Sequence, residues 1–317
     1  MTDTSHRNIL PYVAIGICIL ALSTSAFFIR FADAPGPVTG FYRMFIATLL
    51  MTPLAVYRLF KHRKLNRRNF LFPLFGGMFS GLDLGTWTIA LGFTSVANAT
   101  LLGNTAPLWV ALGTTVLFHE RLKQKFWTGL FLAMSGSALI VGTDYLLHPR
   151  LGVGDTIALF TGIFYAGYYL FTELGRRSLD ALTHTWMVGI SASFILLILN
   201  LLLGNPLTGF SSQTWGIFIA TAIVSQLIGY LASSYALGHL PASVVSVTMI
   251  GQPVVTAIIA IPLLGEIPGR SQILGGIIAL LGIYLVNVSH NKPDDNVGEG
   301  TSLKPANTSG TLETRPN

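Results

Sequence analysis

The chain has 317 residues, of which 51% are hydrophobic and only 10% are charged, and its formal net charge is +6. Soluble domains have about 25% charged residues, so this composition excludes an ordinary soluble enzyme or binding domain and indicates an integral membrane protein. The excess of Lys and Arg lies between apolar segments, where membrane topology explains it, so we expect no nucleic-acid partner.

Apolar segments long enough for an α-helix to cross the hydrocarbon core of a bilayer follow one another along the chain. We place ten of them at residues 10–29, 38–58, 71–93, 97–118, 126–143, 154–173, 184–203, 214–236, 242–264 and 271–288. The short alternating segments of a membrane β-barrel are absent from the sequence. The sequence therefore predicts an all-α integral membrane protein with ten transmembrane helices.

The ends of the chain and its basic connections predict an orientation. Residues 1–9 are polar, and we interpret 10–29 as a retained helix rather than a signal peptide. Residues 289–317 are rich in polar residues and are predicted to be a disordered tail. Lys and Arg concentrate in the connections after the second, fourth and sixth helices, at Arg58, Lys61, Arg63, Lys64, Arg67, Arg68, Arg121, Lys123, Lys125, Arg176 and Arg177. These connections lie on one side, so we expect both termini to be cytoplasmic in a multi-pass inner-membrane protein.

Two parts of the chain repeat at a constant offset of 146 residues. The stretch 101–120 contains Pro107 and ends at Glu120, and the stretch 247–266 contains Pro253 and ends at Glu266. In the helices that follow, Gly129, Ala133 and Gly136 match Gly275, Ala279 and Gly282. Because five helices separate the copies, the second copy must cross the membrane in the opposite direction. We predict two inverted repeats, residues 10–143 and 154–288, which is typical of alternating-access transporters.

The two prolines suggest a polar interior. A proline inside a membrane helix leaves a carbonyl without its partner, and lipid cannot satisfy that group, so such a break must face protein or water. Asn104 lies three residues before Pro107, and Gln252 directly precedes Pro253. A packing kink without a ligand is the alternative, but the symmetric pairing of proline and amide favours a site that lines a lumen.

Residues 87–142 resemble the EamA domain of the drug/metabolite transporter superfamily. The resemblance rests on AL followed by TSVANATLL, on the proline inside the fourth helix, on the glutamate after it, and on Arg43 in the second helix. Residues 154–288 resemble a second EamA domain with a weaker motif, in which LPASVVSV replaces TSVANATL and Trp186 stands near the position matching Arg43. The resemblance implies a basket of ten helices that moves small metabolites, often outward, without a cofactor.

Asp83 lies near the middle of the third helix, where a charge is costly to insert and therefore needs a partner or a function. Arg43 is within reach as a structural ion-pair partner, and a role of Asp83 in substrate contact or proton coupling is the alternative. Trp87 shares the helix face of Asp83, and an aromatic ring beside a carboxylate suits an amine-bearing solute.

Further polar and aromatic side chains lie in the sixth, seventh and eighth helices. Tyr165 and Tyr169 are one turn apart in the sixth helix, with Tyr168 beside them and Glu173 one turn further on. The remaining candidates for the substrate site or the lumen lining are Trp186, Gln226 and Tyr230. We interpret Glu120 and Glu266 as structural caps of the helices that follow them.

The alternatives to a carrier are weaker. HERLK at residues 119–123 lacks the second histidine of a zinc-protease motif, and no G-x-S-x-G elbow occurs, so we expect no enzyme and no bound metal. Cys18 is the single cysteine, which excludes an intrachain disulfide. Gly77, Gly81 and Gly85 permit close helix packing within the chain or in a homodimer. The sequence predicts a secondary transporter, an exporter or exchanger of a small polar metabolite such as an amino acid or nucleotide precursor, with a passive channel or a scaffold as the alternative.

Overall fold

The computed structural model describes residues 9–30, 32–61, 67–94, 96–141, 152–264 and 268–291, and within these ranges the chain is helical without strands. Glu266, the N-terminal residues 1–8 and the tail from residue 292 onward lie outside the described residues. The helices are α1 (Leu10–Arg30), α2 (Gly36–Lys61), α3 (Leu71–Ala90), α4 (Val96–Gly103), α5 (Ala106–Leu117), α6 (Gln124–Val141), α8 (Val153–Arg176), α9 (Ala181–Leu202), α10 (Ser212–Thr221), α11 (Leu231–Leu237), α12 (Ala242–Thr248), α13 (Gly251–Leu264) and α14 (Arg270–Asn291). A short 3-10 turn, η1 (Arg67–Phe70), precedes α3, and a π-helical segment, η2 (Ala222–Tyr230), joins α10 to α11.

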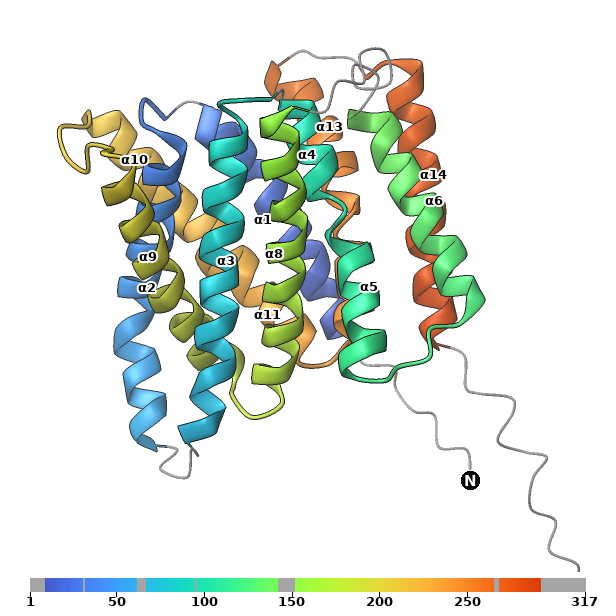
Figure 1. Cartoon of the computed structure of the whole chain (residues 1–317), viewed down its shortest axis with the longest axis horizontal. Coiled ribbons are helices and arrows are strands. Elements are labelled where there is room, and N and C mark those ends of the chain that lie inside the picture. The colour runs from blue at the N-terminus through green and yellow to red at the C-terminus, as the bar shows by residue number, and fades with distance from the viewer. Residues whose placement is uncertain are drawn as a thin grey trace, which may run out of the picture.

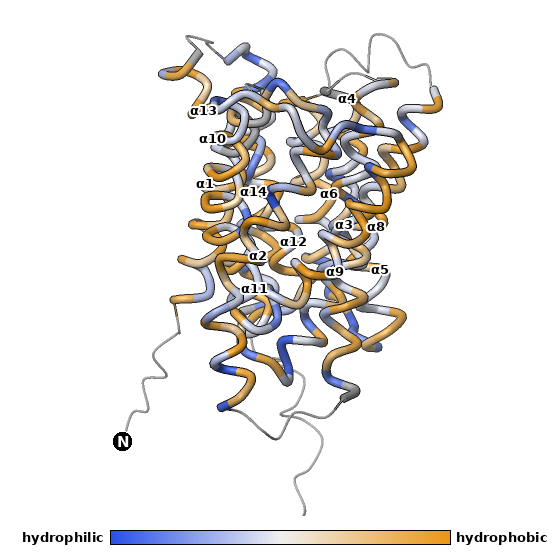
Figure 2. Tube along the Cα trace, turned by 90° about the vertical axis from the view of Figure 1, so that its left-hand side faces the viewer, coloured by the Kyte–Doolittle hydropathy of each residue, from blue (hydrophilic) through white to orange (hydrophobic). Residues whose placement is uncertain are grey.

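Six of the described helical stretches are long and apolar enough to cross a membrane. They are Gly36–Lys61, Val153–Arg176, Ala181–Leu202, Ser212–Leu237, Ala242–Leu263 and Arg270–His290. Their exposed residues are largely aliphatic and aromatic, which is the surface that a lipid environment requires. Figure 2 shows hydrophobic residues along most of the helical length and hydrophilic residues mainly toward the two ends. The predicted all-helical, multi-pass membrane fold is therefore confirmed.

The helices stand side by side in one bundle (Figure 1). At one side α2 and α9 pack together and against α3, and α3 then packs against α8. On the other side α8 contacts α4 and α5, while α6 and α14 pair with each other at the edge of the bundle. On another side of the bundle, α1 packs against η2, α11 and α13.

Two of the predicted membrane segments are interrupted near their prolines. The predicted segment 97–118 is formed by α4 and α5, which are separated at Asn104 and Thr105. Segment 242–264 is formed by α12 and α13, which are separated at Met249 and Ile250. Pro107 and Pro253 lie in the first turn of α5 and α13, where a proline costs least because its missing N–H needs no partner. The predicted breaks are confirmed, and both occur before the proline.

Each break is covered by a different helix. Gly162 of α8 lies against the first break so closely that a Cβ there would be 3.1 Å from the Leu102 carbonyl oxygen and 3.3 Å from the Ala106 nitrogen. At the second break, the buried hydroxyl of Ser23 in α1 donates a hydrogen bond of 3.1 Å to the Gln252 carbonyl oxygen. Protein atoms rather than lipid thus meet the backbone at both breaks, as the physics of the membrane interior requires.

The glycines of one copy of the repeat contact those of the other across the α6–α14 pair, and each touches the glycine at the other end of the matching run. A Cβ on Gly136 would lie 2.5 Å from the Gly275 carbonyl oxygen, and a Cβ on Gly275 would lie 2.7 Å from the Gly136 carbonyl oxygen. Gly129 and Gly282 make the same reciprocal contact, at 2.8 Å and 2.6 Å. The two helices therefore touch backbone to backbone, which only residues without a side chain allow.

This contact generates a prediction about stability. Gly275→Ala should lower the free energy of unfolding by about 1–3 kcal/mol, because its methyl group overlaps backbone atoms that cannot rotate away. Gly276→Ala is the matched control, since a Cβ there meets only Val254 Cγ1 at an ordinary 3.7 Å. We expect thermal unfolding of the purified protein in detergent to separate the two variants. Equal melting temperatures would contradict the backbone-to-backbone contact.

Candidate functional site

A cluster of tyrosines forms the aromatic centre of the bundle. Tyr165, Tyr168 and Tyr169 come from α8, and Tyr230 comes from the end of η2. The Tyr168 and Tyr230 rings are 5.4 Å apart between centroids, and the Tyr169 hydroxyl donates to the Tyr165 hydroxyl at 3.0 Å. The buried Cys18 of α1 belongs to the same cluster. Three helices that are distant in sequence therefore bring hydroxyl and thiol groups into one buried region.

Arg43 of α2 lies against this cluster. Its side chain is 5% exposed, and its Cζ atom is 5.3 Å from the centroid of the Tyr230 ring, which is a cation–π distance. The Nε atom of the guanidinium is buried without a hydrogen-bond partner. A buried guanidinium with a free donor is suited to a carboxylate or another anionic group of a solute.

Asp83 of α3 is half-buried and lies within electrostatic range of Arg43. Among the described residues no ion pair within 4.0 Å joins the two side chains, so the direct structural pair that the sequence suggested is not formed in this conformation. Trp87, one turn away, packs with Ala90, Ala99 and Ala158 in a separate cluster from the tyrosines. The arrangement leaves Asp83 near Arg43 and places Trp87 elsewhere.

The eighth predicted helix contains a feature that the sequence analysis missed. Residues Ala222–Tyr230 form a π-helix, a rare conformation that occurs frequently at functional sites. Gln226 within it is fully buried, and both of its amide atoms, like the Ser225 hydroxyl, have no hydrogen-bond partner. Unpaired buried polar groups are costly, so this segment is a candidate for contact with a solute. Hydropathy carries no signal for a π-helix, because the segment is as apolar as its α-helical neighbours.

The other predicted residues take separate positions. Trp186 donates from Nε1 to the Thr52 hydroxyl at 3.0 Å and packs against α2 with Ala47 and Met51, outside the tyrosine cluster. At the first break Asn104 donates to the Ser137 hydroxyl at 3.2 Å, and Pro107 is buried. At the second break Gln252 and Pro253 are half-buried. The structure thus gathers Arg43, Tyr165, Tyr169 and Tyr230 in one place, with Asp83 near them.

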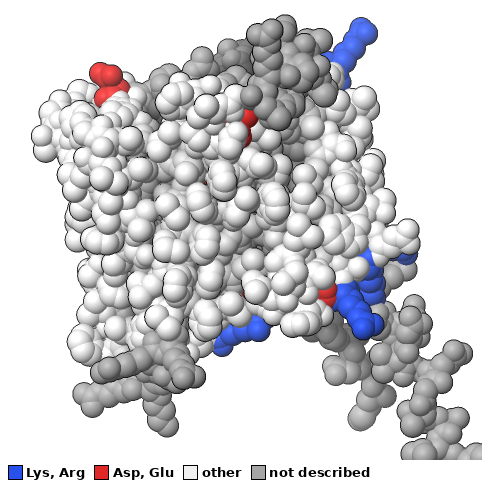
Figure 3. Space-filling model, in the orientation of Figure 1, with Lys and Arg blue, Asp and Glu red and all other residues white. Residues whose placement is uncertain are grey.

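One end of the bundle is basic. Lys and Arg gather along the lower end of the face shown in Figure 3. Their helices reach that end through the last turns of α2 and α8 and the start of α6. We call this end of the bundle, formed by the last turns of α2 and α8 and the start of α6, the basic end. The basic connections therefore share one side, as the sequence predicted.

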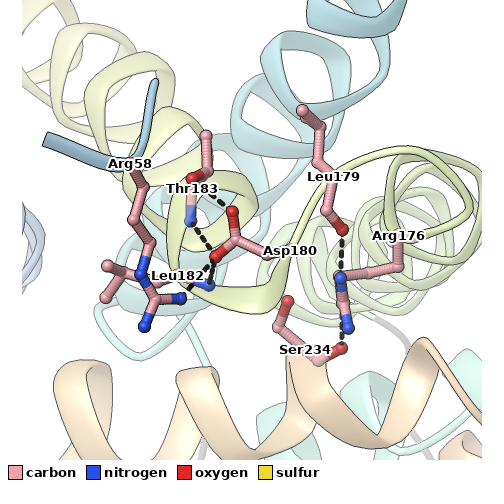
Figure 4. A network of polar contacts seen from close by, with 7 residues as sticks. All are labelled: Arg58, Arg176, Leu179, Asp180, Leu182, Thr183 and Ser234. Atoms are coloured by element: carbon pink, nitrogen blue, oxygen red, sulfur yellow. Dashed lines mark hydrogen bonds and ion pairs between the residues drawn. The ribbon is translucent and has the colours of Figure 1, made fainter. Parts of the chain in front are cut away.

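Polar contacts fasten the basic end across several helices. Asp180, the N-cap of α9, accepts hydrogen bonds from the Leu182 and Thr183 amides, and it forms an ion pair of 2.9 Å with Arg58 of α2 (Figure 4). Arg176 of α8 donates from Nε to the Ser234 carbonyl oxygen of α11 at 2.8 Å and from Nη1 to the Leu179 carbonyl oxygen. These contacts join α2, α8, α9 and α11.

A second group of contacts joins α8 to the interrupted helices. The buried carboxylate of Glu173 accepts from Arg177 at 2.9 Å and from the Ala242 amide at the start of α12 at 2.8 Å. Arg177 in turn lies over the Phe118 ring at the end of α5, 5.0 Å from its centroid. Both interrupted helices are therefore fastened to the end of α8.

Glu120 lies beside this group rather than on the first turn of α6, which begins at Gln124. Partial burial and the neighbouring carboxylate of Glu173 raise the pKa of Glu120, and the Arg177 guanidinium opposes the rise. A cavity of about 340 Å³ opens here between the α5–α6 connection, the start of α12 and the end of α14. Glu120 therefore links a solvent-accessible hollow to the buried Glu173.

A helical bundle with membrane-length helices, two interrupted helices and a buried polar centre is the architecture of a multi-pass membrane transporter. The EamA-like transporter family model matches residues 10–142 and again residues 152–288. The chain therefore belongs to the EamA-like transporter family, as the sequence resemblance predicted.

Named relatives agree with this class. An uncharacterized transporter of Archaeoglobus fulgidus is 29% identical over 211 residues, which is 64% of this chain and 71% of the relative. The pseudopaline exporter CntI of Pseudomonas aeruginosa is 24% identical and covers 79% of this chain and 85% of its own. A probable terminal-alkyne amino-acid exporter of Streptantibioticus cattleyicolor is 25% identical over 60% of this chain and 63% of its own. A solved crystal structure has the same fold, with a TM-score of 0.73 at 14% identity, covering 89% of this chain and 99% of that one.

The Asp180 contacts generate a prediction about pH and stability. Although partial burial opposes it, hydrogen bonds from Thr183 and Arg58 hold the pKa of Asp180 below its ordinary value of 3.8. Asp180→Ala should therefore lower stability at neutral pH by about 1 kcal/mol, because the helix loses its cap. Asp180→Asn keeps one oxygen to cap the Leu182 and Thr183 amides, and loses the exposed ion pair with Arg58 and the acceptor of the Thr183 hydroxyl, so it should cost less than Asp180→Ala.

The pH dependence has a definite sign. A carboxylate with a depressed pKa stabilises the folded state above its ordinary pKa, and that contribution disappears as the pH falls through the folded value. The difference in melting temperature between wild type and Asp180→Ala should accordingly shrink below about pH 3.8. A difference that stays constant with pH would contradict this account.

Proposed function

We propose that this transporter exports or exchanges a small polar metabolite by alternating access between two inverted repeats of five helices. The repeats would be residues 10–143 and 154–288, flanked by a cytoplasmic N-terminus of residues 1–9 and a cytoplasmic tail of residues 289–317. The observation that carries the proposal is the reciprocal glycine contact of α6 with α14, because a pair of elements related by a two-fold axis must exchange identical contacts.

The packing of the other helices supports the same axis. α8 covers the break between α4 and α5, and α1 covers the break between α12 and α13. α3 packs against α8, and the helix formed by α10, η2 and α11 packs against α1. Each of these contacts in the first half thus has a counterpart in the second, and the family model also matches the chain twice. Ten membrane crossings follow if α1, α3, α6 and the α4–α5 pair cross the bilayer along with the six longer stretches.

The substrate site that we propose lies at the tyrosine cluster. Arg43 supplies a free cationic donor, Tyr230 and Gln226 supply aromatic and amide groups, and Asp83 supplies a nearby carboxylate. Such a set suits a compact solute with both an anionic and a cationic or polar group, of which an amino acid is an example. Two relatives, the pseudopaline exporter and the probable terminal-alkyne amino-acid exporter, favour the outward direction. Asp83 is also the candidate for proton coupling if transport is driven by a pH gradient.

The experiment that tests this function first identifies the solute. Metabolites should be compared between cells that overexpress the protein and cells that lack it, and the solute that differs should then be measured in proteoliposomes. We expect saturable transport with wild-type protein. Arg43→Met should lower transport efficiency about tenfold or more, because it removes a charged contact from a buried site, and should leave membrane insertion unchanged.

Arg270→Met, at the exposed start of α14, is the matched control and should transport like wild type. Flux that rises linearly with solute concentration would instead indicate a channel. Absence of flux for every metabolite that differs between the cells would favour a scaffold.

The orientation has its own test. Because Lys and Arg concentrate at cytoplasmic connections, the basic end should face the cytoplasm. In a Cys18→Ala background, Lys61→Cys at the basic end should be protected from an impermeant thiol reagent in intact cells. Thr208→Cys in the α9–α10 connection should be labelled. Labelling of Lys61→Cys from outside would show that the orientation is opposite to the proposed one.

A further inference from the structure

His184 is a buried imidazole that the proposed transport site does not use. It lies one turn inside α9, is 0% exposed, and neither of its ring nitrogens has a hydrogen-bond partner. It packs directly on the backbone of α8, since a Cβ added to Gly175 would be 2.5 Å from its Cδ2 atom and 2.6 Å from its Nε2 atom. Buried imidazoles are normally hydrogen-bonded, so an unpaired one needs an explanation.

The helices packed around His184 carry further buried hydroxyl groups, and none of them forms a hydrogen bond with it. The Thr172 hydroxyl of α8, the Thr185 hydroxyl of α9 and the Ser234 hydroxyl of α11 are likewise buried without partners. The charged groups that act on His184 are Arg176 and Asp180. Of the other packed elements, α3 contributes Phe72, and α11 contributes Ser234 and Tyr235, with Tyr235 acting on Arg176.

The Asp180 carboxylate already accepts hydrogen bonds from groups other than His184. Its Oδ1 atom accepts from Arg58 and from the amides of Leu182 and Thr183, and its Oδ2 atom accepts from the Thr183 hydroxyl. Oδ1 thus accepts from three donors and is saturated, whereas Oδ2 accepts only from the Thr183 hydroxyl, and neither oxygen is hydrogen-bonded to His184. In this arrangement a protonated His184 would be a buried cation near the Arg176 guanidinium with no hydrogen bond to Asp180, which is unfavourable.

A charge on His184 would act on the contacts between helices through Arg176. Its donation to the Ser234 carbonyl oxygen joins α8 to α11 at the basic end, and it lies against Gly238, where a Cβ would be 2.5 Å from its Nη2 atom. Repulsion from a neighbouring cation would weaken this tie. Opening the basic end would admit water to the imidazolium and remove the free-energy cost of burying its charge. Proton binding and opening would therefore favour each other.

We propose that His184 is a proton-binding site that controls the basic end: neutral His184 stabilises the arrangement described here, in which Arg176 ties α8 to α11, and protonated His184 stabilises an arrangement in which that tie is open. The proposal rests on the alternating access proposed above, but it concerns a residue distinct from the tyrosine cluster and from Asp83. It assigns a role to an imidazole at a buried position where packing alone would favour an apolar side chain.

The test measures the opening and needs no substrate. Spin labels are placed at Lys61 and Lys125, two exposed residues on opposite sides of the basic end, in a Cys18→Ala background reconstituted in lipid nanodiscs. Their distance distribution is recorded at about pH 8 and about pH 5.5, which bracket the ordinary titration of histidine. We expect acid to raise the ratio of long-distance to short-distance populations about tenfold in the otherwise unmodified protein.

His184→Gln, which cannot be protonated, should keep the short-distance population at both pH values. His239→Gln is the matched control, because His239 is an exposed histidine at the same end, and it should respond like the parent protein. If His184→Gln fails to insert, the smaller His184→Asn relieves the close contact with Gly175 and repeats the test.

An unchanged pH response in the His184 variants, its loss in His239→Gln, or no response in the parent protein would each overturn the proposal. If wild-type protein shows the pH response but no saturable transport, the proposed function alone is overturned.

Discussion

The constraint on which this structure depends is that lipid offers no hydrogen-bond partner to the backbone. A continuous helix meets that constraint by itself, but the α4–α5 and α12–α13 pairs do not. Each interruption is therefore placed against a helix that supplies close backbone contact, as at Gly162, or a hydroxyl donor, as at Ser23. The small residues that permit these contacts fix which helices can be neighbours, and through them the order of the bundle.

The same logic explains which parts of the fold could be predicted from the sequence. Membrane-length apolar segments, the breaks near Pro107 and Pro253, and the small-residue faces of α6 and α14 follow from local chemistry that any lipid-embedded helix must obey. Gly77, Gly81 and Gly85 fit close helix packing equally well within a chain or between chains, and the structure decides this, since all three lie against α9. The π-helical segment could not be predicted, because an extra residue in a turn leaves no mark on hydropathy.

The candidate site was predictable in part, for a related reason. Helical periodicity places Tyr165 and Tyr169 on one face of their own helix, and the structure joins them to Arg43 and Tyr230. Periodicity does not say which neighbour that face meets, so Trp87 and Trp186 were grouped with residues from which the fold separates them. The sequence does not single out His184, because this residue is at the first position of the predicted apolar segment 184–203. In the structure α9 begins three residues earlier and buries it.

The two proposed repeats would share a packing scheme and differ in chemistry. α3 is a regular helix whose glycines bring its backbone against α9, with Gly77 so close that a Cβ there would be 2.4 Å from the Val188 carbonyl oxygen. The helix that would be its counterpart instead contains η2, which carries Gln226 and Tyr230. A π-helical turn holds more residues than an α-helical one and changes the direction of the side chains that follow. If the bundle consists of the two proposed repeats, regular packing in one and an irregular, polar-lined helix in the other would let a symmetric frame present an asymmetric site, which a solute without symmetry requires.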